Sequence, residues 1–322
     1  MINVRIITRS EDLPPMNCQN FFHSPELFRI SEKVSGQIPF MVVAEDNGRV
    51  VAHMLATLRR RGSLIPPYLF TQGRIYGEGE YDADINKEKV FQLMLSAITL
   101  KLKKKLCLNI EFSDISQKMF GYKHFRKEGY FPVHWMEVHN SLHSMPPSER
   151  LDEKMTERIN KQIEQEVEFK QVENYDEFRS FYRMLNRFPS LKIRRYLLPE
   201  RQFWEMGQSE NCRLFVTQWH GKIIGGCACI YSNNNAYLWY LASKRKSHPL
   251  LFPATATVWG AINDSYERHF RHIYFMDVGL PFKKSQYRDF ILKFGGKEVS
   301  SYRWFRFTFG WLNRIMRLIY KE

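Results

Sequence analysis

The chain contains 322 residues, of which 44% are hydrophobic and 25% charged, a composition typical of a folded globular protein and not of a disordered one. Its net charge of +14 favours an anionic partner such as nucleic acid, anionic lipid or a phosphorylated small molecule, although a basic solvated surface explains the charge equally well. The sequence opens without the apolar segment of a secretory signal, and its apolar runs fall far short of the roughly 20 residues that a membrane span needs. We therefore expect a soluble cytoplasmic protein, with peripheral contact at the inner face of the membrane as an open alternative.

The cysteines are scattered along the chain and form no C-x-x-C pair. Two of them alternate within an apolar run, which predicts small core residues on one face of a strand. The pattern indicates a reducing compartment and predicts that the protein has no metal site. The five residues are Cys18, Cys107, Cys212 and the alternating pair, Cys227 and Cys229.

In the first half of the chain, residues 40–58 contain two apolar runs on either side of Asn47-Gly48. An Asn-Gly pair between two β-rich runs is a strong signal for a hairpin turn. A helical run then covers residues 90–106, and the apolar segment 108–114 that follows predicts a further strand. The second half repeats this order about 170 residues later, with a hairpin over 214–231 that turns at His220-Gly221, a helix over 255–270 and a strand over 272–279.

A third match, between residues 125–140 and 290–305, occurs in the same order. A period of this length is too long for a solenoid and indicates a duplicated domain. Each copy is predicted to fold as an α/β (α+β) unit in which a mixed β-sheet is flanked by helices. We place the first domain at residues 1–145 and the second at 146–322, because the segment 141–147 is polar and contains prolines.

Three short motifs resemble those of the GNAT (acyl-CoA N-acyltransferase) fold, present twice, as in the Fem family of peptidoglycan-bridge aminoacyltransferases and their bacterial relatives. Residues 21–28 (FFHSPELF) are similar to the start of the family's first helix, and residues 72–76 (QGRIY) stand where the family often has G-G-P. Residues 275–279 (FMDVG) resemble the h-D-h-G end of a strand. The resemblance covers nearly the whole chain and implies two tandem GNAT-like domains that transfer an acyl group from acyl-CoA to an amine.

The chain departs from the Fem pattern near its C-terminus. The Fem enzymes commonly carry F-K-x-x-F-G, whose lysine is implicated in transfer, whereas residues 290–295 read FILKFG here. Ile291 stands at the lysine position, and Lys293 follows two residues later. Transfer from aminoacyl-tRNA to a cell-wall precursor is therefore the alternative function. A catalytically silent tandem domain that binds an anionic polymer or a lipid is the other alternative.

The GNAT resemblance also implies a phosphate site after the fourth strand of a domain, where main-chain N–H groups at a helix start bind the pyrophosphate of CoA. In the first domain the matching residues are Arg74, Gly77 and Gly79. The alternative is a glycine-rich turn without a ligand, and the neighbouring Glu78 and Glu80 favour it because they would repel phosphate.

The equivalent loop of the second domain, residues 244–249, is cationic and not rich in glycine. Lys244 and Arg245 could therefore pair with donor phosphates through their side chains. A solvated turn is the alternative for this loop.

Acyl transfer to an amine needs a group that accepts the amine proton and donors that stabilise the oxyanion. Asp277, at the end of a strand in the second domain, is the leading candidate for the base, with a turn or capping role as the alternative. Glu111 is a second candidate, although it could equally pair with one of the lysines at 103–105. Tyr240 is a candidate acid or oxyanion donor, with aromatic core packing as the alternative. The sequence contains no serine-hydrolase, zinc-protease or P-loop motif, which disfavours those classes.

The last residues are predicted to form an amphipathic helix that begins at Trp311. Such a helix suits an anionic membrane surface, and it suits equally a last helix docked on its own domain. The apolar face would contain Trp311, Ile315, Leu318 and Ile319, and the other face Arg314, Arg317 and Lys321.

Overall fold

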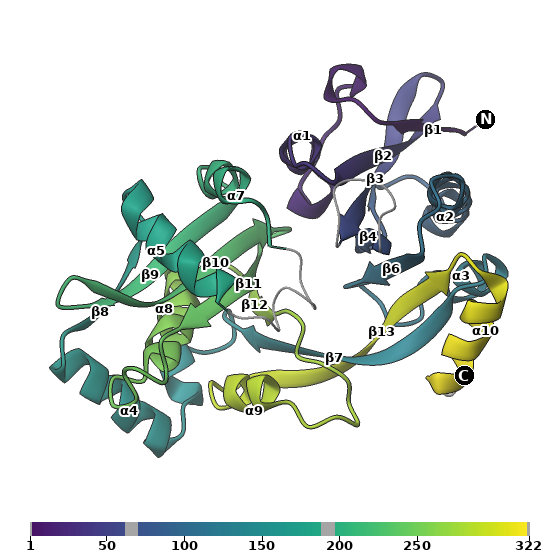
Figure 1. The fold of residues 1–322 in the computed structure, drawn as a ribbon. Coiled ribbons are helices and arrows are strands. Elements are labelled where there is room, and N and C mark those ends of the chain that lie inside the picture. The colour runs from purple at the N-terminus through teal and green to yellow at the C-terminus, as the bar shows by residue number, and fades with distance from the viewer. Residues whose placement is uncertain (1, 62–69, 188–196, 321–322) are drawn as a thin grey trace. The chain divides into compact units, whose positions relative to one another are not determined.

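The computed structural model describes residues 2–61, 70–187 and 197–320 (Figure 1). The chain forms two compact units. Unit 1 contains Met1–Trp135 and Ser300–Glu322, and unit 2 contains Met136–Val299. Each unit holds strands of both orientations with helices packed against them, which confirms the predicted fold class.

Unit 1 is built on strands in the order β1-β2-β3-β4-β6-β13. Neighbouring strands are antiparallel except β4 and β6, which are parallel, and the short strand β5 pairs with β3 outside this order. The elements of this unit are β1 (Asn3–Ile7), η1 (Ser10–Asp12), η2 (Phe21–His23), α1 (Pro25–Glu32), β2 (Gln37–Asp46), β3 (Arg49–Arg61), β4 (Phe70–Tyr76), β5 (Glu80–Tyr81), α2 (Lys87–Lys104), β6 (Asn109–Ser113), α3 (Tyr122–Lys127), most of β13 (Lys297–Phe307) and α10 (Gly310–Ile319).

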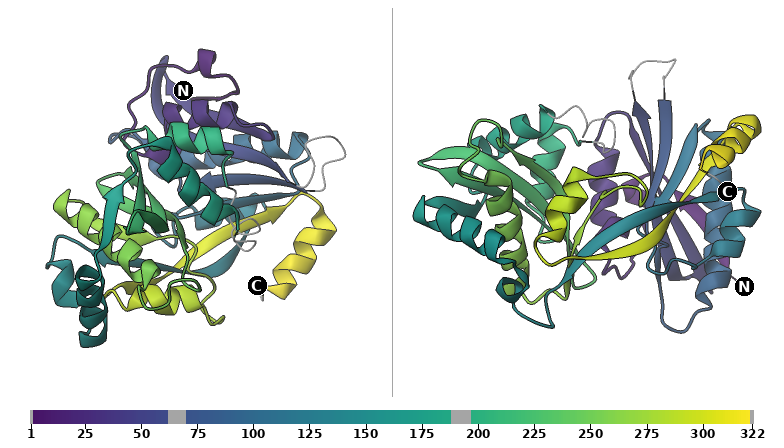
Figure 2. Two further views of the ribbon diagram at one scale, coloured as in Figure 1. Left: turned by 60° about the vertical axis from the view of Figure 1, so that its left-hand side comes forward. Right: turned by 90° about the horizontal axis from the view of Figure 1, so that it is seen from below.

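Unit 2 is built on strands in the order β7-β12-β11-β10-β9-β8, shown from two further directions in Figure 2. Here β11 and β12 are the parallel pair, as β4 and β6 are in unit 1. The elements are most of β7 (Phe131–Ser141), η3 (Pro147–Arg150), α4 (Glu153–Glu164), β8 (Val167–Gln171), α5 (Tyr175–Asn186), α7 (Glu200–Gly207), β9 (Cys212–Trp219), β10 (Lys222–Ser232), β11 (Asn235–Ser243), α8 (Pro253–Glu267), β12 (His272–Phe275) and α9 (Gln286–Leu292).

The two hairpins predicted from the sequence are both present. Asn47 and Gly48 join β2 to β3 with φ angles of 52° and 80°, and two central residues with positive φ are characteristic of the tight turns that match strand twist. His220 and Gly221 join β9 to β10 with φ angles of 46° and 73°. The internal repeat that they mark is thus a repeat of structure.

Helix α2 covers one face of the unit 1 sheet. It begins where Asn86 accepts a hydrogen bond from the N–H of Lys89, an N-terminal cap. Gly73 of β4 lets the helix approach closely, because a Cβ there would lie 2.8 Å from Cδ1 of Leu102. The residues that α2 buries recur at spacings of three and four, as an amphipathic helix requires: Val90, Phe91, Met94, Leu95, Ile98, Thr99 and Leu102.

The Gly225-Gly226 pair of β10 lets helices approach the unit 2 sheet from both faces. A Cβ on Gly225 would lie 2.4 Å from Oγ1 of Thr257 in α8, whereas one on Gly226 would lie 2.7 Å from Phe181 of α5. Consecutive strand residues point to opposite faces, so α8 and α5 pack on opposite sides of the sheet. The predicted core position of Cys227 and Cys229 is confirmed, since both are fully buried.

Strands β7 and β13 each begin in one unit and end in the other. In unit 2, β7 pairs with β12, for example through Val138 and Phe275. In unit 1, β13 pairs with β6, for example through Trp304 and Phe112. Each unit therefore takes a strand from the other half of the sequence, and these compact units differ from the linear division expected between residues 145 and 146.

The C-terminal helix α10 belongs to unit 1, not to the second repeat. The Asn313 amide accepts a hydrogen bond from the N–H of Phe307 and donates one to the carbonyl of Gly129, at 2.9 and 3.0 Å. The opposite side of α10 is solvent-exposed, with Trp311 at 64% and Leu318 at 74%. The predicted apolar face of the helix is thus exposed, and Lys321 lies outside the described residues.

Candidate functional site

In unit 2 the parallel strands β11 and β12 separate partway along their length. They pair from Ala236 with Ile273 to Leu238 with Phe275. Strand β12 then ends, while β11 continues to Ser243. Among the described strands, none continues the pairing on this edge of β11 beyond Leu238, so that residues 241–243 have no described strand beside them there.

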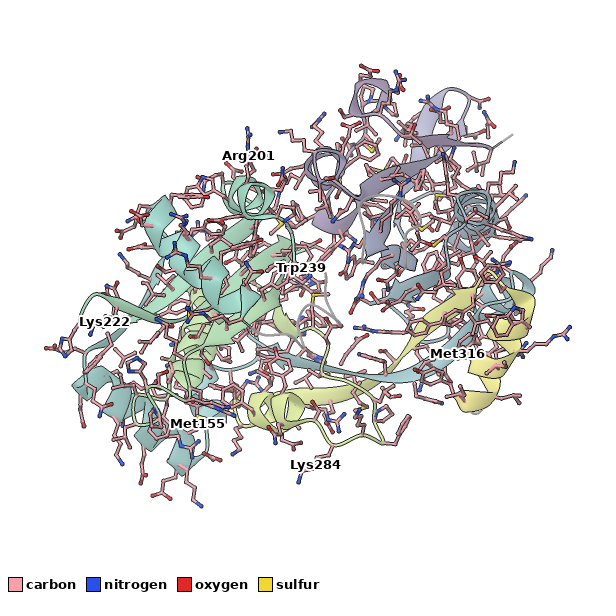
Figure 3. All side chains as sticks on the ribbon, in the orientation of Figure 1. Met155, Arg201, Lys222, Trp239, Lys284 and Met316 are labelled. Carbon is pink, nitrogen blue, oxygen red and sulfur yellow. The ribbon has the colours of Figure 1, made fainter. Side chains whose placement is uncertain are left out.

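A β-bulge marks the start of the separation. Across β10 and β11, Ala228 pairs with Tyr240 and Cys229 with Leu238, so that Trp239 is the extra residue of β11 at the bulge. Its side chain is labelled in Figure 3. A bulge bends its strand and changes the direction of nearby side chains, and bulges are over-represented next to active sites. The separation and the bulge make this part of unit 2 a candidate active site.

The corresponding strands of unit 1 do not separate. Strands β4 and β6 pair from Gln72 with Asn109 to the last residues of both strands, Tyr76 and Ser113. The pairing continues one residue further, since the N–H of Gly77 donates to the carbonyl of Ser113 at 2.7 Å. Within the residues described, the two parallel strands therefore separate before the end of the longer strand only in the second copy.

The cationic loop predicted to bind phosphate joins the open end of β11 to helix α8. Its backbone is folded on itself, since the N–H groups of Ser247 and His248 donate to the carbonyl of Lys244, both at 3.1 Å. Arg245 and Lys246 are exposed. Among the described residues, no ion pair to a carboxylate is formed by any of the three cations, which leaves their charges available to an anion.

Helix α8 begins directly after this loop without a side-chain cap. Phe252 is the N-cap in a left-handed conformation with φ 45°, and Pro253 is the first helical residue. The N-terminus of a helix carries partial positive charge and attracts anions. The loop and the helix start thus add positive potential beside the end of β11.

Asp277, the predicted base, lies just beyond the end of β12. Its backbone is left-handed, with φ 61°, and its side chain is half-buried. The turn is tied to β7, because the N–H of Met136 donates to the carbonyl of Gly279 at 3.0 Å. A non-glycine residue in this conformation is uncommon, and such residues cluster at functional sites. The structure thus places Asp277 beside the separation of the strands.

Tyr240 is fully buried in unit 2. Its ring lies 5.2 Å from that of Phe203 in α7 and 4.9 Å from that of Trp239. These contacts favour the core-packing alternative for Tyr240, while its role in proton transfer stays a prediction.

The glycine-containing loop of unit 1 satisfies its polar groups internally. The carboxylate of Glu78 accepts hydrogen bonds from Lys87 Nζ at 2.9 Å, from the N–H of Ser116 at 3.0 Å and from the Ser116 hydroxyl. The Glu78 carboxylate therefore already accepts hydrogen bonds from donors that a bound phosphate would need. Gly77 and Gly79 have φ angles of 80° and 105°, as a tight turn requires. These contacts favour the structural-turn alternative for the loop.

Arg74 and Glu111, both predicted site residues, pair with each other in unit 1. Arg74 Nη1 lies 3.2 Å from Glu111 Oε2, and Arg303 Nη1 of β13 lies 3.2 Å from Glu111 Oε1. The amide of Gln72 also donates to this carboxylate at 2.8 Å. Glu111 thus pairs with two arginines of neighbouring strands and not with the lysines at the end of α2. Because both of its oxygens are engaged, it is better suited to hold β4, β6 and β13 together than to accept a proton.

Two residues of these sites could not be identified from the sequence pattern. The bulge at Trp239 depends on the register between β10 and β11, which residue types alone do not specify. Arg303 reaches Glu111 only because β13 pairs with β6. Because Arg303 and Glu111 lie in different halves of the sequence, an interpretation of each half as a separate domain does not predict their contact.

The motif that departs from the Fem pattern lies in α9 and the turn after it. Ile291 is fully buried in the core of unit 2, whereas Lys293 is exposed. The position occupied by lysine in those enzymes is therefore part of the hydrophobic packing here.

No family model matches the chain, and no curated protein sequence matches it. Solved structures share its fold. A structure of FemX is 8% identical, with a TM-score of 0.63 over 95% of this chain and 96% of that one. A tandem GNAT protein from the clavulanic acid biosynthesis pathway is 10% identical, with a TM-score of 0.61 over 95% of this chain and 99% of that one.

A third similar structure is L-PGS from Bacillus licheniformis, which is 13% identical and has a TM-score of 0.57 over 83% of this chain and 85% of that one. Identities this low establish a common fold and leave substrates open. The chain has the tandem GNAT fold predicted from its sequence.

Proposed function

We propose that the protein is an N-acyltransferase that uses acyl-CoA as donor and an amine as acceptor, and that unit 2 carries out the reaction. The observation that supports this proposal is the separation of β11 from β12 after Leu238 and Phe275, in a chain with the tandem GNAT fold. In unit 1 the equivalent strands β4 and β6 stay paired to their ends.

The last residues of β11, 241–243, suit the extended arm of the donor. A chain that contains amides can add to a strand edge through main-chain hydrogen bonds, and the pantetheine arm of CoA contains two such amides. With its phosphates at the loop after Ser243, the arm would run back along residues 241–243. The acyl group would then lie toward the bulge at Trp239.

The donor phosphates are assigned to the cationic loop and the start of α8. Lys244, Arg245 and Lys246 supply three charges, and a hydrogen bond to a charged group contributes about 1.5–3 kcal/mol. The N-terminus of α8 adds main-chain donors.

In the proposed reaction the amine nitrogen attacks the thioester carbonyl carbon. A C–N bond forms, the C–S bond breaks, the amine loses one proton and CoA leaves as the thiol. We assign the amine proton to the carboxylate of Asp277, which lies at the end of β12 beside the separation. The same proton then passes to the departing thiolate sulfur, which gives the thiol and restores the carboxylate. Positioning of the two reactants supplies much of the remaining acceleration in such a site.

The donor experiment is a calorimetric titration of the full chain with CoA. We expect one binding site, and we expect the double variant Lys244→Gln/Arg245→Gln to bind at least about tenfold more weakly, because two charge-assisted contacts are lost. Lys154→Gln/Lys161→Gln is the matched control, since both lysines are exposed on α4 and lie outside the loop. Gly77→Val tests the loop of unit 1, and its CoA affinity should stay unchanged.

Other results of the donor-binding experiment would favour one of the alternative functions or the alternative donor site. Failure to bind CoA together with specific retention of aminoacyl-tRNA would favour the Fem-like function, which the net charge of +14 also suits. Binding of neither donor would favour a silent module. If Gly77→Val alone abolishes CoA binding in a folded protein, the donor site belongs to unit 1.

We propose in addition that helix α10 makes peripheral contact with an anionic membrane. No described helix is both long and apolar enough to cross a bilayer, so any contact through α10 would be at the surface. Its exposed side carries Trp311, Ile315, Leu318 and Ile319, and Arg314 and Arg317 lie on the same helix. An apolar stripe beside cations is the pattern of helices that lie in a membrane interface.

A further inference from the structure

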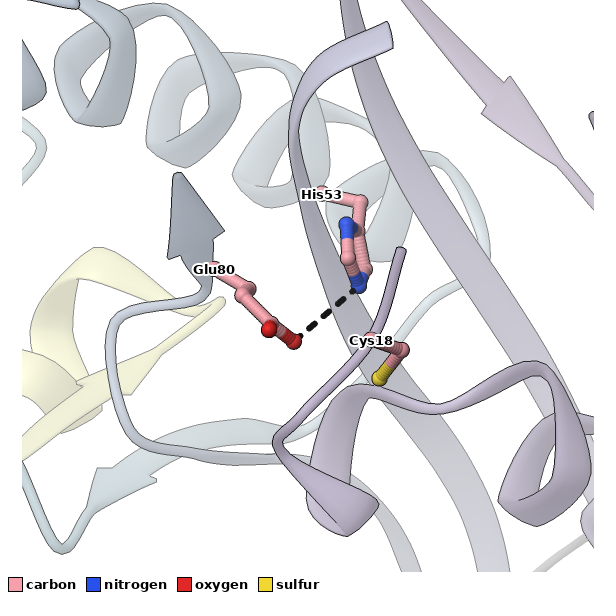
Figure 4. A group of neighbouring side chains, drawn as sticks. All are labelled: Cys18, His53 and Glu80. Atoms are coloured by element: carbon pink, nitrogen blue, oxygen red, sulfur yellow. Dashed lines mark ion pairs between the residues drawn. The ribbon is translucent and has the colours of Figure 1, made fainter. Parts of the chain in front are cut away.

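Three side chains with metal-binding atoms come together in unit 1, whereas the proposed acyltransferase site belongs to unit 2. The sulfur of Cys18, a ring nitrogen of His53 and a carboxylate oxygen of Glu80 all lie within 4.8 Å of one another (Figure 4). His53 is in β3 and Glu80 begins β5, and the two are directly paired across these antiparallel strands. Paired residues point to the same face of a sheet, so the pairing brings the two side chains together beside Cys18.

The ring nitrogen Nε2 of His53 is a possible metal ligand whose hydrogen-bonding capacity is unused among the described residues. Its side chain is 4% exposed, and Nε2 lies 3.6 Å from Glu80 Oε2, beyond hydrogen-bonding distance. Nε2 is buried and has no hydrogen-bond partner among the described residues. A buried polar atom without a partner is costly and calls for an explanation, and a bound cation would supply one.

Glu80 and Cys18 are held in place by the segment that precedes η2. The carboxylate of Glu80 accepts hydrogen bonds from the N–H groups of Gln19 and Asn20, at 2.7 and 3.2 Å. The thiol of Cys18 donates to the carbonyl of Asn20 at 3.2 Å. Burial, and next the Glu80 carboxylate, raise the pKa of the Cys18 thiol, whereas burial lowers the pKa of His53. The three groups therefore combine an anion, a neutral imidazole and a thiol that a cation would help to ionise.

A cavity of about 600 Å³ opens beside the cluster. It gives an ion a route to His53 and Glu80, which line it, and leaves room for a further ligand from solvent. Its lining includes Gln19, Val51, His53, Glu80, Tyr81 and Asp82.

We propose that Cys18, His53 and Glu80 form a site for a divalent transition-metal ion of the zinc type, with an open fourth position toward the cavity. Sulfur, imidazole nitrogen and carboxylate oxygen are the three ligand types that Zn²⁺ takes in proteins. Tetrahedral bonds of zinc length place ligand atoms about 3.5 Å apart, and the 3.6 Å between Nε2 and the carboxylate already meets that spacing. The ion would fasten the segment before η2 to β3 and β5.

The test uses the full chain, stripped of metal with a chelator and titrated with Co²⁺ and then with Zn²⁺. We expect one equivalent of Co²⁺ to produce a thiolate-to-metal charge-transfer band in the near ultraviolet, which Zn²⁺ then displaces. Cys18→Ala should abolish the band, and His53→Gln and Glu80→Gln should each weaken binding at least roughly tenfold. Cys107→Ala is the control, since it removes a different thiol of unit 1, which is buried, and it should leave the band intact.

Thermal unfolding gives a second measurement that does not depend on colour. An ion that binds only the folded state raises its stability in proportion to the logarithm of the free ion concentration. Zn²⁺ should therefore raise the melting temperature of the wild type and of Cys107→Ala, but not that of Cys18→Ala. Cobalt binding without the thiolate band, or a zinc-induced shift that persists in folded Cys18→Ala, would overturn the proposal and leave the cluster as a hydrogen-bonded one.

Discussion

Leu238 and Phe275 are the last residues that pair between the parallel strands β11 and β12. One residue further, Trp239 forms a bulge in β11, and β12 gives way to the turn that holds Asp277 in a left-handed conformation. The separation of the two strands therefore lies between the bulge at Trp239 and the left-handed backbone of Asp277. Because irregularities of both kinds gather at functional sites, the reaction is best tested first at Asp277.

Replacing Asp277 by asparagine should lower turnover by about 10²- to 10⁴-fold, the usual contribution of a general base. Asparagine tolerates the left-handed conformation as well as aspartate does, so the turn should survive. The measurement is release of the CoA thiol from acetyl-CoA with a panel of primary amines. The affinity for CoA should change little, because the carboxylate is assigned to the amine and not to the donor.

Asp289→Asn is the control for this change, since Asp289 is exposed in the first turn of α9. It should keep wild-type turnover. A folded Asp277→Asn variant with near wild-type turnover would remove Asp277 from the mechanism and leave it as a turn residue.

The parts of the fold that depend on local chemistry could be predicted from the sequence. The turns at Asn47-Gly48 and His220-Gly221 require positive φ and mark both hairpins. The cap at Asn86 and the spacing of Val90 and Met94 likewise mark α2. These signals lie within a few residues of one another, so the sequence shows them directly.

The features that depend on distant strand pairing could not be predicted in this way. The exchange of β7 and β13 brings Arg303 to Glu111, and no spacing in the sequence indicates it. The cluster at Cys18 was missed for the same reason, because its three ligands come from separate segments and form no spaced motif. Which copy of the repeat has separated strands is likewise a matter of register.

The buried charge cluster of unit 1 predicts a large loss of stability in Glu111→Gln. The change leaves Arg74 and Arg303 without the carboxylate that both contact at 3.2 Å. Breaking a buried ion pair by removing one partner costs about 3–5 kcal/mol, which urea unfolding followed by fluorescence would measure. Glu45→Gln, which breaks the partly exposed pair with Arg5, should cost less than about 1 kcal/mol. Similar small losses for both variants would show that the buried cluster does not stabilise the sheet.

The lowered pKa of His23 predicts how the free energy of unfolding depends on pH. Burial, and next the nearby His53, lower the pKa of His23 to about 3, while its Nδ1 accepts a hydrogen bond from the N–H of Leu55 at 3.1 Å. An unfolded chain binds this proton below about pH 6.5, whereas the folded protein does not until much lower pH. The stability from neutral His23 is therefore complete above pH 6.5 and is lost as the pH falls toward 3, by up to about 1.4 kcal/mol per pH unit.

Urea unfolding at several pH values between 7 and 4 tests this dependence. His23→Asn keeps an acceptor for the N–H of Leu55 but does not titrate, so its stability should fall less steeply than that of the wild type as the pH falls. His220→Asn, at an exposed turn whose conformation asparagine tolerates, should keep the wild-type slope. Equal slopes for wild type and His23→Asn would contradict the assignment.

Helix α10 gives a prediction that separates membrane binding from structural packing. The double variant Trp311→Gln/Leu318→Gln changes two side chains that are 64% and 74% exposed, so the melting temperature should stay within a few degrees of the wild type. Binding to vesicles that contain an anionic phospholipid should nevertheless fall, because the apolar part of the interfacial contact is lost.

Co-sedimentation with such vesicles at low and high salt completes the argument for α10. Each cation near an anionic bilayer contributes about 1 kcal/mol, so the wild type should bind weakly at low salt and less in high salt, where charges are screened. Arg314→Gln should weaken binding at low salt only, whereas Met316→Leu, a conservative change on the half-buried side of α10 (Figure 3), should leave it unchanged.

A chain truncated after Phe309 removes the anchor of Asn313 as well and is a weaker test, since it can fail by unfolding. If the glutamine double variant sediments as well as the wild type at every salt concentration, the exposed stripe does not bind membranes.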